Sequence, residues 1–257
     1  MKKYELTSAN KVFEGRKVYQ IRSLVYIEEL NIKPGDLGGW IETEDNLSHF
    51  DNAWIRINGI ACNGALICDN GVVEDSGIIC GNAQVSERAI VKDNAVIRGN
   101  ARVDGDAVIG GNAKVFDDAY VTGSAIIRDS AQICSKARVS GNAIIEGRAI
   151  VFGKSMISGS AHVFGNAKIY DNARVYDSAQ VYEDSSINQN AQVYDHAHIY
   201  GSAKIFENAH VSNKARVYDR AKIHGEAWVL GNSVIGGVAD ISCIMDIVMK
   251  NVDELEE

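Results

Sequence analysis

Two consecutive segments, Ala95-Val-Ile-Arg-Gly-Asn100 and Ala101-Arg-Val-Asp-Gly-Asp106, decide the fold of this chain, because both carry the same six-residue pattern. Each begins with alanine, has valine or isoleucine third, and has glycine fifth. The same register runs from Ala53 to Ile244 without an insertion, which makes 32 hexads. The third position is isoleucine or valine in every hexad but one, where Ala61 replaces it. A strict internal period of this kind predicts a repeat architecture.

The alternation inside each hexad predicts a short β-strand with one apolar face. Side chains two apart in a strand point the same way, so the first and third positions face inward and the second and fourth face outward. The fifth and sixth positions are mostly glycine, aspartate, asparagine or serine, which tolerate turns and bond to their own backbone. The chain therefore bends once in every hexad. An α-helix is excluded, because the apolar residues show no 3.6-residue period.

Three hexads close a triangular coil, and stacked coils pair each strand in parallel with the strand three hexads later. Residues 53–244 then form about ten and a half coils of an all-β, single-stranded parallel β-helix. Valine and isoleucine fill one inner column, and alanine fills the column beside it. Branched side chains favour strands, whereas alanine is small enough to lie near a corner.

Both ends of the chain break the repeat, as a solenoid requires, because its terminal coils must be covered. Residues 1–52 contain alternating runs at 17–22 and 23–27, and a turn at Lys33-Pro-Gly-Asp36 follows. We expect a small β-rich cap there. Residues 245–257 place apolar side chains at helical spacing, which predicts an amphipathic helix over the last coil.

The amino-acid composition limits where in the cell we expect the protein and what we expect it to bind. The net charge of -8 argues against non-specific binding to nucleic acid or to an anionic membrane. No apolar stretch approaches the roughly 20 residues that span a bilayer, and the first residues are polar, so we expect a cytoplasmic protein without a membrane partner. Five cysteines without a CxxC pair indicate reduced thiols rather than a disulfide framework or a zinc site.

The repeats resemble the left-handed parallel β-helix of hexapeptide-repeat proteins, and that resemblance alone implies the left-handed sense. In the acyltransferases of that group, glycine or aspartate directly follows the isoleucine or valine, whereas here it comes one residue later. The head of the chain, Gly35-Asp-Leu-Gly-Gly-Trp-Ile41 with Asn46-Leu-Ser48 and Asn52-Ala-Trp-Ile55, is similar to phage and bacterial β-helix proteins labelled as transferases or as polymer-forming.

The repeats offer little for catalysis. Enzymes on such a scaffold need a loop that leaves the coil and shields a cleft from water, and no hexad here is interrupted. We therefore predict no catalytic residue and no cofactor, with His198 as the candidate general base if the chain is an acyltransferase. No acidic partner is predictable for the outward His162, His198 or His210, and no two histidines are five apart, so no metal site is expected.

Three cysteines share one predicted column, because Cys80 lies one coil after Cys62 and Cys134 lies three coils after Cys80. Cys62 and Cys80 should be direct neighbours. A redox or metal role for the pair is possible, but without a charged activator we interpret these cysteines as small exposed residues on a strand.

Outward aromatic residues give the clearest functional signal, and they concentrate in the C-terminal half. With three hexads in each coil, four of them stack into an aromatic ladder, formed by Phe164, Tyr182, Tyr200 and Tyr218. Polar or basic residues two positions earlier flank the ladder, among them His162, His198 and Arg216. Aromatic rings beside cations bind sugars, bases or proteins. Such ladders also stabilise a sheet by themselves, at roughly 0.2 to 1 kcal/mol per pair.

These observations predict a non-catalytic binding or scaffold protein that forms a homo-oligomer through the ladder residues. An acyltransferase is the alternative, and it rests on fold resemblance alone. A third reading follows from the phage-like head of the chain, namely a counter-defence protein that sequesters a host protein or a small nucleotide. The uninterrupted repeats favour binding over catalysis.

Overall fold

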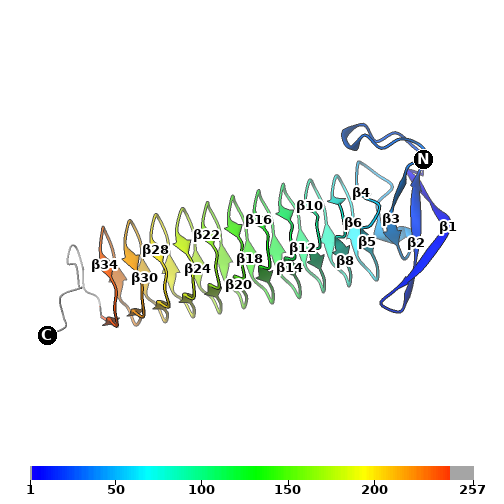
Figure 1. Cartoon of the computed structure of the whole chain (residues 1–257). Helices are drawn as coiled ribbons and strands as arrows, with labels where there is room; N and C mark the ends of the chain where they lie inside the picture. Colours follow the sequence, from blue (N-terminus) through cyan, green and yellow to red (C-terminus); the bar gives the residue numbers. More distant parts are fainter. Residues whose placement is uncertain (1, 244–257) are drawn as a thin grey trace. The chain divides into compact units, whose positions relative to one another are not determined.

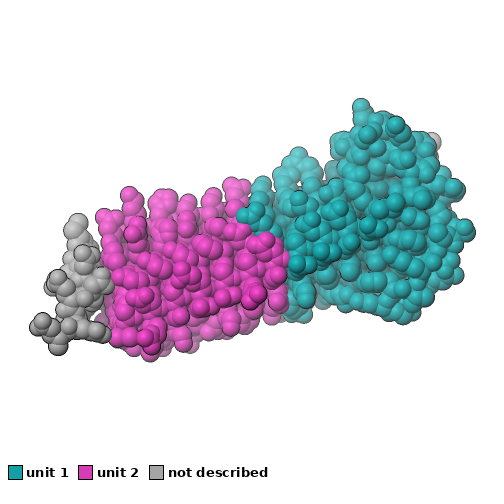
Figure 2. Space-filling view, viewed as in Figure 1, with its two compact units in different colours: residues 1–128 teal, residues 129–257 magenta. Residues whose placement is uncertain are grey.

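The computed structural model describes residues 2–243 and confirms a parallel β-solenoid of about 11 turns (Figure 1). The described residues contain no helix beyond two single 3₁₀ turns, η1 (Glu28–Leu30) and η2 (Glu44–Asn46). Two compact units divide the chain between Arg128 and Asp129 (Figure 2). The helix predicted at residues 245–257 lies outside the described residues, and the left-handed sense stays a prediction.

Each hexad contributes one two-residue strand at its second and third positions, and in unit 1, residues 1–128, these strands form three faces. Face A holds β5 (Ile60–Ala61), β8 (Ile78–Ile79), β11 (Val96–Ile97) and β14 (Lys114–Val115). Face B holds β4 (Trp54–Ile55), β7 (Val72–Val73), β10 (Ile90–Val91), β13 (Val108–Ile109) and β16 (Ile126–Ile127). Face C holds β6 (Leu66–Ile67), β9 (Gln84–Val85), β12 (Arg102–Val103) and β15 (Tyr120–Val121).

Unit 2, residues 129–257, repeats this arrangement in its described part. Face A holds β17 (Gln132–Ile133), β20 (Ile150–Val151), β23 (Lys168–Ile169), β26 (Ser186–Ile187), β29 (Lys204–Ile205), β32 (Lys222–Ile223) and β35 (Asp240–Ile241). Face B holds β19 (Ile144–Ile145), β22 (His162–Val163), β25 (Gln180–Val181), β28 (His198–Ile199), β31 (Arg216–Val217) and β34 (Val234–Ile235). Face C holds β18 (Arg138–Val139), β21 (Met156–Ile157), β24 (Arg174–Val175), β27 (Gln192–Val193), β30 (His210–Val211) and β33 (Trp228–Val229).

The predicted register of three hexads per coil is confirmed within both units. Ile90 pairs in parallel with Val72 and Val108, and His198 pairs with Gln180 and Arg216. The inner columns are buried as the alternation requires, since the first and third positions, such as the alanines and the valines or isoleucines, are almost all fully inaccessible. Burial of each valine or isoleucine stabilises the fold by about 1.5–3 kcal/mol, so the inner columns account for most of its stability.

The turns differ from the prediction in where their side chains bond. Fifth-position residues adopt the left-handed conformation, for example Asp93 with φ 57° and Gly111 with φ 63°. Several of their side chains bond to the backbone of the next coil. Asp93 Oδ2 accepts a hydrogen bond from the Gly111 N–H at 2.7 Å, and Glu183 accepts one from Gly201 at 2.7 Å. The turn residues therefore bind successive coils together as well as bending the chain.

The N-terminal segment converts an antiparallel sheet into the parallel one. Strand β2 (Arg16–Ser23) pairs antiparallel with both β1 (Tyr4–Phe13) and β3 (Leu37–Ile41), and β3 pairs in parallel with β5. The buried Asn46 donates to the carbonyls of Asn63 and Ala65 at 2.8 Å each. These contacts satisfy polar backbone groups that the end of a solenoid would otherwise leave without partners.

Lys3 makes similar contacts from the start of the chain. This buried side chain donates through Nζ to the carbonyls of Phe50, Asp51 and Ala53, at 2.8 to 3.2 Å. Burial lowers the pKa of Lys3 to about 8, while the charge of Asp51 opposes the shift. A cation is tolerated here because three carbonyl dipoles surround it.

The cysteine interpretation is wrong in one respect. Cys62 and Cys80 are neighbours, as predicted, but they are buried rather than exposed. They form a small second core on the outer side of face A with Val18 of β2, against which Phe13 and Trp40 pack. The hydrogen bond between the thiols is the main cause that lowers the pKa of Cys62 and raises the pKa of Cys80. An antiparallel hairpin thus covers outward positions that the repeat alone would expose.

Candidate functional site

The predicted aromatic ladder is present on face B of unit 2, along strands β22, β25, β28 and β31. The ring centroids of Phe164 and Tyr182 are 4.7 Å apart, those of Tyr182 and Tyr200 are 5.1 Å apart, and those of Tyr200 and Tyr218 are 5.2 Å apart. The planes within each pair deviate from parallel by 3° to 11°. The four rings therefore form one continuous offset stack, because each is the fourth residue of its hexad.

A glycine takes the next position after the last ring of the ladder. Gly236 occupies the fourth position of the hexad that follows Tyr218 on this face, and a Cβ atom added there would lie 2.3 Å from Cζ of Tyr218. The Tyr218 ring therefore lies over Gly236. Any larger residue at this position would displace the last ring of the stack.

The stacking determines what the ladder can bind. Both ring faces of Tyr182 and of Tyr200 are covered by their neighbours, so these faces cannot stack against a base or a sugar. Ring edges and phenolic hydroxyls remain for contact, and the side chains are only half-buried. Burial raises the pKa of Tyr182, with the neighbouring Tyr200 and Glu183 adding to the effect, so its hydroxyl stays protonated at neutral pH. The ladder thus presents a row of hydrogen-bonding groups on rigid rings.

The flanking column of face B contains His162, Gln180, His198 and Arg216 in consecutive register. This confirms the prediction that these second-position residues lie in one column, one in each coil. Arg216 is exposed, whereas the two histidines are half-buried. The column therefore places one permanent positive charge beside Tyr218.

His162 has an acidic partner that the repeat did not make predictable. Its Nε2 lies 2.8 Å from Oε1 of Glu146, and its ring packs against Phe164 with centroids 4.4 Å apart. The contact joins a fourth position to the second position of the next coil, a separation of 16 residues. Tyr120 and Asp104 make the same contact in unit 1 at 2.9 Å. This spacing is the signal that would have revealed the pair, because fourth-position side chains lean toward the preceding residues of the next strand.

His198, the candidate general base, lacks such an orienting partner. Burial lowers its pKa, and the charges of Arg216 and His196 lower it further. Among residues 2–243, no carboxylate forms a hydrogen bond with its ring. A general base needs both a suitable pKa and a group that holds it toward the substrate, so this geometry does not favour acyl transfer at His198.

The other faces of unit 2 carry shorter stacks. Rings 4.9 Å apart pair Phe152 with Tyr170 on face A and Tyr176 with Tyr194 on face C. Further along the chain, face A stacks Phe206 on His224 and face C stacks His210 on Trp228. On face C, Tyr194 also contacts His210 edge-on, with centroids 6.3 Å apart, so face B is distinguished by four rings that all stack in parallel.

Comparisons with known proteins add a family likeness over a short segment. A family model described as the YdcK beta solenoid repeat matches residues 167–183. This segment is similar to that repeat. It covers Tyr170, Tyr176 and Tyr182, one aromatic residue on each face, and the match supports the solenoid fold. No curated protein matches the chain. No helix in residues 2–243 is long and apolar enough to cross a membrane.

Proposed function

We propose that the protein is a non-catalytic β-solenoid scaffold that assembles through face B of unit 2, with a second copy of the chain as the partner. The observation that carries the proposal is the four-ring ladder of Phe164, Tyr182, Tyr200 and Tyr218, whose rings are already ordered by stacking on one another. Binding through preordered side chains loses little conformational entropy. Tyrosine and arginine are also the residue types that dominate the energetics of protein interfaces.

The distribution of charge on face B supports a copy of the same chain. Glu146, which also contacts His162, lies at one end of the ladder and Arg216 lies at the other, four strands away. In a twofold arrangement with antiparallel ladders, the Glu146 end of one copy faces the Arg216 end of its partner. The two copies also share one coil spacing of about 4.8 Å, so their rows of hydroxyls keep in step along the whole contact.

The experiment compares two double variants by analytical ultracentrifugation and native mass spectrometry. Tyr182→Ala with Tyr200→Ala removes the centre of the ladder, and we expect it to shift the assembly to monomers. Tyr176→Ala with Tyr194→Ala is the matched control, because it removes a stacked tyrosine pair from face C. The control should keep the assembly. The proposal would be refuted if the unchanged protein is a monomer. It would also be refuted if both double variants lose the assembly to the same extent. Circular dichroism confirms that each variant folds.

A further inference from the structure

The aromatic column on face A of unit 2 is interrupted at one coil. After Cys134, its next five fourth positions are Phe152, Tyr170, Asn188, Phe206 and His224. Phe152 stacks on Tyr170 with centroids 4.9 Å apart, and Phe206 stacks on His224 with centroids 4.7 Å apart. Between these two stacks, Asn188 replaces a ring. The column therefore lacks one ring at β26, and we call this interruption between Tyr170 and Phe206 the notch.

The width of the notch matches one planar ring. Tyr170 and Phe206 are two coils apart, which is about 9.6 Å at the spacing of neighbouring strands. Neighbouring rings of the face B ladder have centroids 4.7 to 5.2 Å apart, so a ring at the level of Asn188 would stack on both neighbours at a similar distance. Unlike Tyr182 in the ladder, Tyr170 and Phe206 each have another ring of the column stacked on only one face.

Asn188 supplies polar groups at the inner end of the notch. Its Nδ2 donates to the Tyr170 hydroxyl at 2.7 Å, which fixes the amide against that wall. The second N–H and the amide oxygen have no partner among residues 2–243. One donor and one acceptor side by side match the edge of a nitrogen heterocycle, as asparagine does when it reads adenine.

The two sides of the notch carry opposite charges, and the first side is basic. The second positions of these three hexads are Lys168, Ser186 and Lys204, which pair in consecutive register. The two lysines are exposed, and neither ammonium has a salt-bridge or hydrogen-bond partner within the described part of the chain. The residue between them, Ser186, is small and half-buried. An anionic group on this side would lie between two cations.

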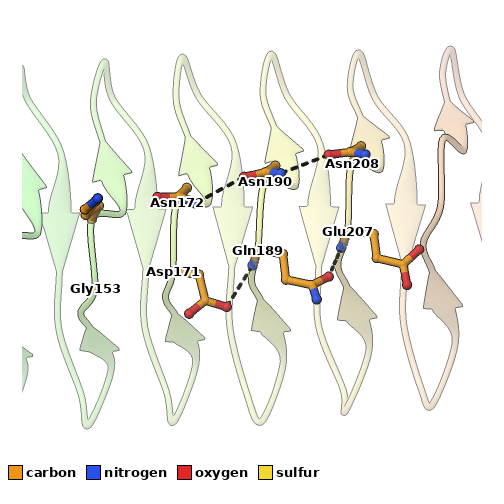
Figure 3. A pocket seen from close by; sticks show the side chains of 8 residues that line it. Gly153, Asp171, Asn172, Gln189, Asn190, Glu207 and Asn208 are labelled. Carbon is orange, nitrogen blue, oxygen red and sulfur yellow. Dashed lines mark hydrogen bonds between the residues drawn. The ribbon is translucent and has the colours of Figure 1, made fainter.

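The opposite side of the notch is acidic. A hollow of about 580 Å³ there includes Asp171 and Glu207 in its lining (Figure 3). Asp171 accepts a hydrogen bond from the Gln189 N–H at 3.2 Å, and Glu207 accepts one from Gly225 at 2.7 Å, so both carboxylates are held in place. They repel an anion from the hollow. A ligand with a planar ring and an anionic group is therefore oriented with its anion toward the lysines.

We propose that this notch binds a nucleoside phosphate, with the base between Tyr170 and Phe206 and the phosphate between Lys168 and Lys204. Stacking on aromatic side chains holds every base, and the Asn188 amide adds hydrogen bonds to the edge of the base. The notch lies on face A, so the proposal is independent of assembly through face B.

Adenosine monophosphate is the probe, with adenosine and ribose 5-phosphate as partial ligands, and titration calorimetry measures the dissociation constants on the full chain. We expect adenosine monophosphate to bind more tightly than either fragment. Asn188→Tyr completes the column with the residue found in the same hexad position elsewhere, so it should keep the fold and weaken binding more than tenfold. Ser158→Tyr is the matched control, because it adds a tyrosine next to Tyr176 on face C and should leave binding unchanged.

The lysines separate recognition of the phosphate from recognition of the base. Lys168→Ala and Lys204→Ala should each weaken the binding of adenosine monophosphate several-fold and leave the binding of adenosine unchanged. Lys214 lies on a distant turn, so Lys214→Ala should change the binding of neither. Absence of binding at millimolar ligand would overturn the proposal, and so would equal binding to Asn188→Tyr. Loss of oligomers in the face B variants with binding retained would separate this site from the assembly interface.

Discussion

Unit 1 and unit 2 share one hexad but present different surfaces. On face B the outward second positions of unit 1 include the aliphatic Val72, Ile90, Val108 and Ile126, whereas those of unit 2 include His162, Gln180, His198 and Arg216. The inner columns of both units are the same buried alanine, valine and isoleucine. The difference teaches that the coil depends on the inward and turn positions, and that the outward positions are free to specialise.

The fourth positions of face B differ in the same way. In unit 1, Arg56 and Glu74 form an ion pair with Nε and Oε1 3.1 Å apart. In unit 2, the corresponding column is the aromatic ladder. Neighbouring coils are thus linked by charge in one unit and by stacked rings in the other.

The strongest test of this comparison sets an inner residue against its outward neighbour. Ile199→Ala removes a fully buried side chain and should lower the free energy of unfolding by about 2–5 kcal/mol. His198→Ala, one residue earlier on the outer side, should change it by less than about 0.5 kcal/mol. Urea denaturation followed by circular dichroism measures both. Similar losses in the two variants would mean that the outward column also maintains the coil.

Ile109→Ala and Val108→Ala repeat the test in unit 1. Ile109 is fully buried and Val108 is half-buried. We expect the same ranking as in unit 2, because the inner columns are alike. A smaller difference in unit 1 would show that its aliphatic outward column contributes to the core.

The cap of unit 1 should respond to pH through Lys3. Its pKa is about 8 in the folded chain, below the ordinary value, so between pH 8 and about 10 the unfolded chain binds more protons than the folded chain. The free energy of unfolding should therefore rise with pH across this range, by up to about 1.4 kcal/mol per pH unit. Below pH 8 the contribution is flat.

Lys3→Met is the control for this prediction, because it cannot titrate. The difference between the two proteins in urea denaturation at pH 7.5, 8.5 and 9.5 isolates the contribution of Lys3. If the free energy of unfolding rises with pH as steeply in Lys3→Met as in the unchanged protein, the pH dependence does not come from Lys3. Above pH 10 the trend should reverse, because burial raises the pKa of Tyr4 and the unfolded chain then loses its phenolic proton first.

The smallest expected effect distinguishes the two kinds of link between coils. Double-mutant cycles should give a coupling of about 0.5–1.5 kcal/mol for Tyr182 and Tyr200, and about 0.2–1 kcal/mol for Arg56 and Glu74. Only the ion pair should weaken between 0.05 M and 1 M sodium chloride, because salt screens exposed charges. Equal salt dependence of both couplings would remove the physical distinction between the units.

The repeat predicts whatever depends on the backbone register. It places the ladder rings one coil apart and puts His162 and His198 in one column, and both placements are confirmed. The register of three hexads per coil does not by itself predict contacts that depend on the lean of a side chain, which need the 16-residue spacing as well. Glu146 beside His162 is such a contact, because the two residues lie at different hexad positions.

The burial of Cys62 and Cys80 could not be predicted for another reason. Their hexads follow the pattern, so the repeat assigns them to the exterior. The hairpin that covers them belongs to the aperiodic head, where Glu14 at its tip pairs with Arg98 of the repeats. A contact between the repeats and a segment outside them does not change the six-residue pattern, so the pattern cannot predict it.

The hydrogen bonds from turn side chains to the following coil, such as Asp93 to Gly111, have an evolutionary consequence. Every such bond is local to two adjacent coils, so an in-frame duplication that encodes one whole coil would recreate all of them at the new junction. The gene can thus gain or lose coils without a change in either end of the protein. Each event would lengthen or shorten all three faces together, and the extent of the repeat array is then set by copy number rather than by point mutation.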